Sequence, residues 1–288
     1  DPSALGAHRP ISLTQSLYKL YAMLLHHRLR MPLETCLRKT QYGFRPQRST
    51  SQPVHIIRRI LEKFERHGEA LQVVCLDWAK AFDTISHAAI QSSLLRLGVP
   101  EPMVQAVMSL YSCPEYVVRD AKSTSTVYKQ HCGVRQGCPL SPLLFISVLT
   151  CIMHDVDVEY EQRWGLLPHV FSAAVPFWDI EYADDTILVA RSAETLSRLL
   201  HLLEKHASRV GLFLNHNKCE HLPLNSDARI YFSTSYTRCA CRHCTSHPGA
   251  HQDDGPAVLV PKAEAAKYLG IHLTNAAHTI PDAGKRGL

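Results

Sequence analysis

Two adjacent aspartates, Asp184 and Asp185, stand between two apolar segments, residues 175–180 and 186–190. The first segment contains Val, Phe, Trp and Ile and the second contains Ile, Leu and Val, and both have the length of β-strands, so the pair is expected at the turn of a β-hairpin. Two carboxylates about 4 Å apart repel each other by roughly 4 kcal/mol at an effective dielectric near 20. A buried hairpin would therefore need a cation beside them, whereas a solvated turn would not.

A third carboxylate, Asp77, follows the apolar segment 71–76, which is typical of a fully buried strand. Carboxylate oxygens are the ligands that a hard divalent cation such as Mg²⁺ prefers. Two such ions about 4 Å apart hold the attacking and leaving oxygens in phosphoryl transfer. Asp77, Asp184 and Asp185 are therefore candidate metal ligands and catalytic residues; a solvated Asp-Asp loop is the alternative.

The charge of the chain is unevenly distributed. Lys and Arg number 31 against 26 Asp and Glu, a formal net charge of +5. Residues 1–70 carry twelve basic and five acidic side chains, so this part is +7 and the remainder is −2. A basic part beside an acidic, metal-binding part is typical of a nucleic-acid enzyme, although basic helical faces also occur on ordinary protein surfaces.

Hydrophobic periodicity predicts mixed helices and strands. Leu13, Leu17, Leu20 and Leu24 are expected to form the apolar face of a helix over residues 11–31, with Tyr21 and Leu25 beside them. Further helices are expected over residues 53–68, 78–98, 103–111, 139–153 and 192–210, with a hairpin over 116–129 and a connection over 155–175. The longest apolar segment, residues 142–153, is too short to span a bilayer, so no membrane association is expected.

Seven sequence blocks carry a family resemblance. They are residues 9–13 (RPISL), 41–45 (QYGFR), 77–83 (DWAKAFD), 133–142 (GVRQGCPLSP), 182–185 (YADD), 211–220 (GLFLNHNKCE) and 268–270 (YLG). In this order and spacing, the chain resembles a reverse transcriptase of a non-LTR (LINE-like) retrotransposon. The resemblance implies an α+β fold: a right-hand polymerase palm, with an antiparallel sheet backed by helices, partial fingers and no thumb.

The resemblance also implies a division of the chain into parts. Residues 1–70 would belong to the partial fingers, and residues 71–224 to the palm, with a fingers segment near 100–138. Residues 225–260 depart from the family pattern and would form an insertion. Residues 261–288 would hold the primer-grip hairpin and the start of the connection to a thumb. The chain begins without Met, close to the first block, so it is expected to be a fragment.

The family's functional residues carry over onto the matching positions. Asp77, Asp184 and Asp185 would hold two Mg²⁺ ions, and Lys218 would act near the departing pyrophosphate. Arg9 would contact the nucleotide triphosphate, with Lys19 and Arg45 as weaker candidates for the same group of basic side chains.

Gln136 and Gly137 would lie under the nucleotide, and Tyr182 would support the metal site. Phe82 would crowd the sugar 2′ position, and Asp83 would bond locally. Tyr268, Leu269 and Gly270 would grip the primer. The alternatives are surface positions for Arg9 and Lys218, and a core position for Phe82.

The insertion contains a cluster of potential zinc ligands. Cys239, Cys241, Cys244 and His247 have suitable donor atoms for Zn²⁺, but their spacing is cramped and one small loop supplies them all. A disordered, thiol-bearing insertion is the alternative. The other seven cysteines are scattered, several of them within apolar segments, so no disulfide framework is expected.

These expectations combine into an RNA-directed DNA polymerase that uses an RNA template, a DNA primer and dNTPs. The resemblance places such an enzyme inside the cell, in the nucleus. The alternative is a truncated, catalytically inactive relic that still binds nucleic acid. An RNA-dependent RNA polymerase shares the palm chemistry, and a small zinc-dependent nucleic-acid module at residues 239–251 is a further alternative.

Overall fold

The structure is a computed structural model and describes residues 11–112, 114–119, 123–168, 170, 177–233 and 258–274. The chain divides into two compact units, each made from two separate stretches of sequence. Unit 1 comprises Asp1–Leu37 and Lys80–Cys151, and unit 2 comprises Arg38–Ala79 and Ile152–Leu288. The assignment of residues to fingers, palm, insertion and primer grip stays a prediction, because the division into two compact units does not test it.

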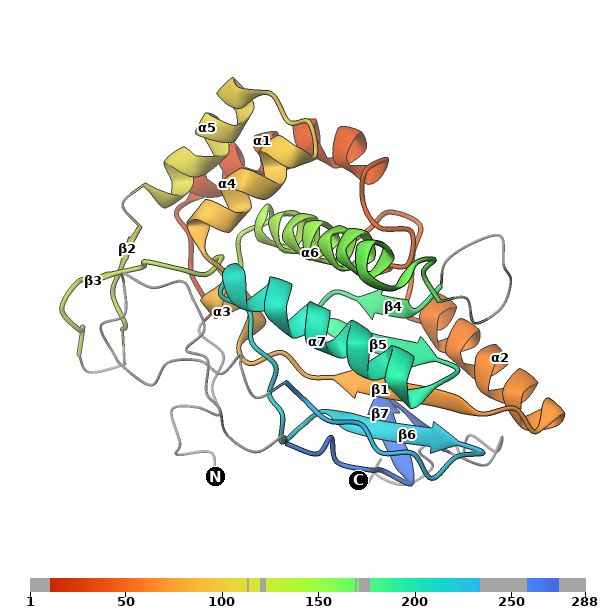
Figure 1. Ribbon diagram of the computed structural model, residues 1–288. Coiled ribbons are helices and arrows are strands. Elements are labelled where there is room, and N and C mark those ends of the chain that lie inside the picture. Colours follow the sequence, from red (N-terminus) through yellow and green to blue (C-terminus); the bar gives the residue numbers. More distant parts are fainter. Residues whose placement is uncertain are drawn as a thin grey trace. The chain divides into compact units, whose positions relative to one another are not determined.

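A four-stranded antiparallel sheet is the centre of unit 2 (Figure 1). In spatial order its strands are β4 (Asp179–Tyr182), β5 (Asp185–Ala190), β1 (Leu71–Leu76) and β6 (Glu220–Leu224). β1 pairs with β5 on one side and with β6 on the other, and its last residue, Leu76, lies opposite Thr186. All six residues of β1 are buried, as predicted, because an internal strand covered on both faces has no side facing water.

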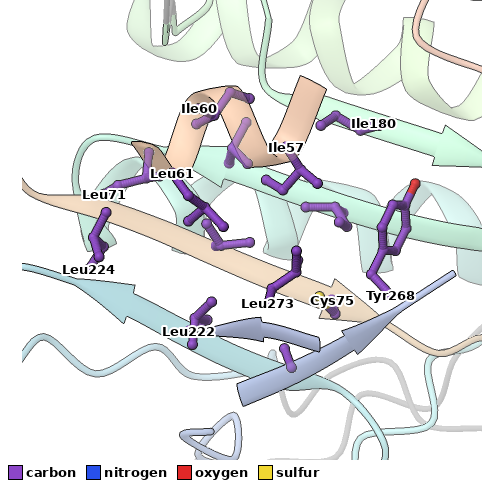
Figure 2. Close-up of a cluster of buried hydrophobic side chains, with 14 of the residues drawn as sticks. Ile57, Ile60, Leu61, Leu71, Cys75, Ile180, Leu222, Leu224, Tyr268 and Leu273 are labelled. Carbon is purple, nitrogen blue, oxygen red and sulfur yellow. The ribbon is translucent and has the colours of Figure 1, made fainter. Parts of the chain in front are cut away.

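One face of this sheet packs against helix α2 (Ser51–His67) and against a hairpin of β7 (Ala265–Tyr268) and β8 (Ile271–Thr274) (Figure 2). The apolar side of α2 is the predicted one: Ile57, Ile60, Leu61 and Phe64 are buried in this cluster. The helix ends at Gly68, whose φ of 64° is the left-handed conformation typical of a residue just after a helix.

Helix α7 (Ala193–Arg209) packs against β5 (Figure 1). Ser192 caps it, because its hydroxyl oxygen accepts the N–H of Thr195 at 3.1 Å. The predicted leucine face is buried. Gly211 follows the helix with a φ of 86°, as expected for a glycine that ends a helix.

Helix α6 (Ser141–Trp164) is longer than the sequence predicts. The expected connection over residues 155–175 is wrong for its first part, because Val156 and Tyr160 are buried and continue the helical spacing from Met153. The helix is long and apolar enough to cross a membrane, but 72% of its most apolar stretch of 18 residues is buried inside the protein. α6 therefore has the burial of a core helix.

The remaining elements belong to unit 1. They are α1 (Ser16–Glu34), α3 (Ala81–Thr84), α4 (His87–Arg96), α5 (Glu101–Met108), the 3₁₀ helix η2 (Ser109–Tyr111), β2 (Glu115–Tyr116) and β3 (Tyr128–Lys129). The β2–β3 hairpin confirms the pairing predicted over residues 116–129. The single helix predicted over residues 78–98 is wrong: the chain leaves helical geometry at Ile85, and Ser86 caps a new helix by accepting the N–H of Ala89.

The predicted apolar face of α1 is wrong except at Leu25, which is buried as expected. Leu13 is 98% exposed and Leu17 is 81% exposed, and Leu20 and Leu24 are also exposed. The buried residues of this helix are Ala22, Leu25, Leu29 and Leu33. Both sets have helical spacing, so the periodicity predicts a helix correctly but does not determine which of two apolar sides is buried.

Candidate active site

The two adjacent aspartates lie at a tight turn, as predicted. β4 and β5 are joined by Ala183 and Asp184 alone, and Tyr182 pairs with Asp185 across the turn. Ala183 has a φ of 59°, a left-handed conformation that is uncommon for a residue with a side chain. Asp184 and Asp185 are exposed. Water therefore screens their repulsion, and repulsion alone does not require a cation at this turn.

The third aspartate ends the neighbouring strand. One residue beyond the last β1–β5 pair, the antiparallel register brings Asp77 opposite Asp185. The next residue, Trp78, donates its indole N–H to the hydroxyl oxygen of Thr186 at 3.2 Å, which joins the two strands just beyond the paired region. The three predicted acidic residues thus come together at one edge of the sheet.

The loop between α7 and β6 holds Asp77 through its backbone. The N–H of Asn215 donates to the carbonyl oxygen of Asp77 at 2.7 Å, and the N–H of Asp77 donates to the sulfur of Cys219 at 3.4 Å. Burial raises the pKa of the Cys219 thiol to about 12, so the sulfur stays a neutral acceptor. Sequence reasoning missed these two contacts, because nothing in the local pattern marks residues 138 and 142 positions away as partners.

Lys218 lies exposed on the same loop. Two contacts of its neighbour His216 fix the loop: the ring nitrogen Nε2 lies 2.7 Å from Oε1 of Glu204, and the ring stacks on Phe232 at 3.9 Å between centroids. The role of Lys218 near the pyrophosphate stays a prediction.

The acidic edge has the ligand chemistry of a Mg²⁺ site but not a complete ligand cage. In the part of the chain that the structure describes, no three Asp, Glu, His or Cys side chains lie close enough together to hold a metal ion by themselves. Mg²⁺ is commonly bound by one or two carboxylates together with water and substrate phosphates, rather than by a complete protein cage. Asp77 and Asp185 on neighbouring strands, with the exposed Asp184 beside them, fit that chemistry.

The loop predicted to lie under the nucleotide belongs to unit 1. Gln136 donates its side-chain N–H to Oδ1 of Asp83 at 2.9 Å, so Asp83 is bound by a distant residue and not locally as predicted. A Cβ at Gly137 would lie 2.7 Å from the carbonyl oxygen of Ser12. This glycine therefore allows a close approach to the chain's own backbone, and its contact with a nucleotide stays a prediction.

Phe82 is half-buried in unit 1. Its ring stacks on that of Phe145, with the centroids 4.6 Å apart and the planes 22° from parallel. The stacking fixes the orientation of the Phe82 ring while leaving part of it accessible. This placement is compatible with both interpretations of Phe82, a ring that crowds the sugar 2′ position and a core residue. The contact with the sugar therefore stays a prediction.

The predicted primer grip is a hairpin, as expected, with β7 and β8 joined by Leu269 and Gly270. Both turn residues have positive φ, 47° and 81°, as a two-residue hairpin turn of this kind requires. Tyr268 is only 3% exposed and belongs to the hydrophobic core (Figure 2). Burial raises the pKa of its hydroxyl. The exposed residues of this hairpin are Ala265 and Lys267 on β7 and Gly270 at the turn, and primer contact stays a prediction.

The basic residues expected around the nucleotide have different outcomes. The prediction that Arg45 is one of the basic side chains around the nucleotide is wrong. Arg45 is buried and donates to the carbonyl oxygens of Arg38 and Gln41 at 2.7 and 3.0 Å. Lys19 is exposed on α1, and its role stays a prediction. The other predicted positions lie outside the described residues: Arg9 and the potential zinc ligands Cys239, Cys241, Cys244 and His247.

Comparison with known proteins adds the family. The model of the family described as "Reverse transcriptase (RNA-dependent DNA polymerase)" matches residues 1–273. A Pol polyprotein from the type-2 retrotransposable element R2DM of Drosophila melanogaster is 30% identical over 211 residues, which are 73% of this chain and 19% of that protein. A probable RNA-directed DNA polymerase from transposon BS of the same organism is 35% identical over 147 residues, 50% of this chain and 16% of that protein. The chain thus spans less than a fifth of each of these relatives.

Among solved structures, apo telomerase from Candida tropicalis, truncated of its C-terminal domain, matches 90% of this chain and 44% of that chain with a TM-score of 0.55. At 14% identity this likeness concerns the fold, and it confirms the predicted α+β polymerase palm. The acidic strand edge, the matched family model and the retrotransposon relatives agree. The chain therefore belongs to the reverse transcriptase family of RNA-dependent DNA polymerases, and its relatives are polymerases of non-LTR retrotransposons, as the sequence blocks predicted.

Proposed function

We propose that this chain is the polymerase segment of a retrotransposon protein and extends a DNA primer with dNTPs on an RNA template. Membership of the reverse transcriptase family supports the reaction class. The observation that carries the proposal is the meeting of Asp77 with Asp184 and Asp185 at one edge of the central sheet. All three expected acids are present there, so the alternative of an inactive relic is not favoured.

The site would work through charge and position. Asp77 and Asp185, with Asp184, would hold Mg²⁺ beside the incoming nucleotide. When bound, two such ions lower the pKa of the primer hydroxyl and neutralise charge on the transferred phosphate. The chain supplies the fixed scaffold. Asn215 and Cys219 bind the backbone of Asp77, so the position of the backbone that carries its carboxylate is fixed.

Lys218 would meet the leaving pyrophosphate from its loop. An ammonium group at that position would neutralise charge and could supply a proton to the leaving oxygen. Phosphoryl transfer of this kind depends mostly on positioning and electrostatic stabilisation, and the protein forms no covalent bond with the substrate. The residues named here accordingly bind and orient substrate groups.

The proposal predicts a specific effect of neutralising one acid. In the full-length protein, Asp184→Asn is expected to lower dNTP incorporation on an RNA template by at least about a hundredfold, because charge stabilisation of the transition state is weakened. Incorporation into a DNA primer with Mg²⁺ is the measurement. Asp227→Asn, which removes an exposed carboxylate paired only weakly with Lys262 at 3.5 Å, is the matched control.

Extension by Asp184→Asn at the rate of the unaltered protein would refute the metal assignment. An unaltered protein that binds primer–template but incorporates no nucleotide would instead select the inactive relic. Addition of NTPs in preference to dNTPs would select the RNA polymerase alternative.

A further inference from the structure

The left-handed residue of the acidic turn is held by a side chain from another part of unit 2. Gln41 is fully buried, and its amide makes four hydrogen bonds. The oxygen Oε1 accepts the N–H of Ala183 at 2.8 Å and the N–H of Gly43 at 2.7 Å. The nitrogen Nε2 donates to the carbonyl oxygen of Ala183 at 3.1 Å and to Oε2 of Glu181 at 3.0 Å.

Only an amide satisfies this environment. Two backbone N–H groups need an acceptor at one end of the side chain, and the carbonyl oxygen of Ala183 and Oε2 of Glu181 need a donor at the other. The partners therefore fix the orientation of the Gln41 amide. One side chain binds both backbone groups of Ala183, the residue whose positive φ brings the chain from Tyr182 round to Asp184 and Asp185.

The segment that carries Gln41 is itself held against β4. The N–H of Tyr42 donates to the carbonyl oxygen of Glu181 at 2.7 Å. The guanidinium groups of Arg45 and Arg48 both donate to the carbonyl oxygen of Gln41, at 3.0 and 3.1 Å. Because these contacts fix its backbone, Gln41 provides a rigid support on which the turn rests.

Gly43 completes the support. A Cβ built on it would lie 2.1 Å from the backbone nitrogen of Ala183, far inside van der Waals contact. Only a residue without a side chain allows the two backbones to approach this closely. The segment and the turn therefore fit each other through backbone contact as well as through the Gln41 amide.

We propose that Gln41 is a positioning residue of the polymerase site: it holds Ala183 in its left-handed conformation and so sets where the carboxylates of Asp184 and Asp185 lie. This inference rests on the proposed polymerase function. Conformations of this kind persist only where the surroundings enforce them, and they concentrate at functional sites. A carboxylate displaced by about 1 Å can slow a reaction about a hundredfold.

The test compares two buried glutamines of the same sheet region. Gln41→Leu is expected to lower kcat for dNTP incorporation at least about tenfold and to weaken Mn²⁺ binding, measured by electron paramagnetic resonance without substrate, while the KM for dNTP changes little. Gln72→Leu is the matched control. Gln72 is buried on β1, distant in register from Asp77, and its Oε1 lies 2.8 Å from Nε2 of His221. It is expected to lose stability but to retain Mn²⁺ affinity.

A second variant keeps the test decisive if Gln41→Leu does not fold. Gln41→Glu preserves shape and both accepted hydrogen bonds, but it places an oxygen against the Ala183 carbonyl and Glu181. Adding Glu181→Gln restores a donor between positions 41 and 181 and leaves the Ala183 carbonyl without one. The double variant is expected to recover thermal stability while kcat and Mn²⁺ affinity stay low.

The outcomes separate the two proposals. Full activity and full Mn²⁺ affinity in the double variant, or equal effects of Gln41→Leu and Gln72→Leu on Mn²⁺ binding, would overturn the positioning role. Failure of the unaltered protein to incorporate dNTPs would overturn the proposed function instead. Mn²⁺ binding that weakens only in the Gln41 variants would still support the positioning role, because that measurement needs no turnover.

Discussion

The acidic residues of this site are positioned through their backbones. Asn215 binds the carbonyl oxygen of Asp77, and Cys219 binds its N–H. The turn that carries Asp184 is fixed through both backbone groups of Ala183. Hydrogen bonds to the backbone fix the position of the residue without using its carboxylate oxygens, which can then bind a metal or substrate. This arrangement favours precise chemistry at an exposed edge.

Phe82 gives a prediction at the scale of one residue. Phe82→Ala is expected to raise NTP incorporation relative to dNTP by about tenfold or more, because removing the ring removes the clash with a ribose 2′-hydroxyl. The ratio of kcat/KM for matched NTP and dNTP is the measurement. Phe145→Leu alters the stacking partner and serves as control. If both variants only destabilise the protein and leave the ratio unchanged, Phe82 is a core residue.

Strand β4 carries two buried carboxylates with different surroundings. Asp179 is paired with Arg38, whose guanidinium nitrogen Nη2 lies 2.7 Å from Oδ1, and Arg38 also binds Asp157 at 2.6 Å. Glu181 accepts one hydrogen bond from Gln41, while its Oε1 is buried with no partner among the described residues. Burial, and then the charge of Asp179, raise the pKa of Glu181 to about 8.

This pKa predicts how the stability of the element depends on pH. The unfolded value is 4.5, so between about pH 4.5 and 8 the folded protein binds a proton that the unfolded chain has released. The stabilisation is complete below pH 4.5 and is lost as pH rises through 8. Glu181→Gln, which carries no charge, is therefore expected to gain stability relative to the unaltered protein as pH rises.

Urea unfolding at several pH values from 5 to 9 measures this difference, expected to grow by up to about 1.4 kcal/mol per pH unit within the window. Glu264→Gln, at an exposed position, is the control for removing one carboxylate. A constant difference between Glu181→Gln and the unaltered protein across this range would contradict the raised pKa.

At the scale of the whole molecule, charge is the property that acts over distance. The excess of basic residues in positions 1–70 includes several on the outer side of α2. Such residues either contact nucleic-acid phosphates or form an ordinary solvated surface. The two interpretations differ in their dependence on salt, because each phosphate that a basic side chain binds releases a counterion.

Neutralising two of these residues distinguishes the interpretations. Lys63→Gln with Arg66→Gln is expected to reduce the slope of log affinity against log salt by about 1 for each phosphate that the altered side chains no longer bind. Titration of a primer–template duplex at several salt concentrations is the measurement. Arg59→Gln is the control, because Arg59 is paired with Glu62 at 2.6 Å. An unchanged slope in the double variant would identify a solvated face.

The elements that the sequence predicts well are those whose signals are local. α2, α7 and β1 have one clear apolar periodicity or an unbroken apolar run, and each of the two helices is followed by a glycine of positive φ. The acidic turn is predictable because two strand-like segments flank a pair of carboxylates with almost no residues between them. Local propensity and burial agree in all these cases.

The elements that the sequence predicts poorly need information from elsewhere in the chain. α1 has two apolar sides, and the packing of other residues decides which one is buried. α6 continues past residue 153 because Val156 and Tyr160 are buried against other parts of the chain. The charged residues around them in the sequence do not predict this burial. The helix after Asp77 breaks at Ile85, where the backbone adopts an extended ψ of 133°.

The sequence by itself determined the family, the fold class and the three acids, because these are encoded in residue types at fixed spacing along the chain. Only the tertiary structure showed that Gln41 binds Ala183 and that Cys219 binds Asp77, across separations of 142 residues in each case. Hydrogen bonds of this kind depend on distances of about 3 Å between groups, and such distances are set by how strands and loops pack.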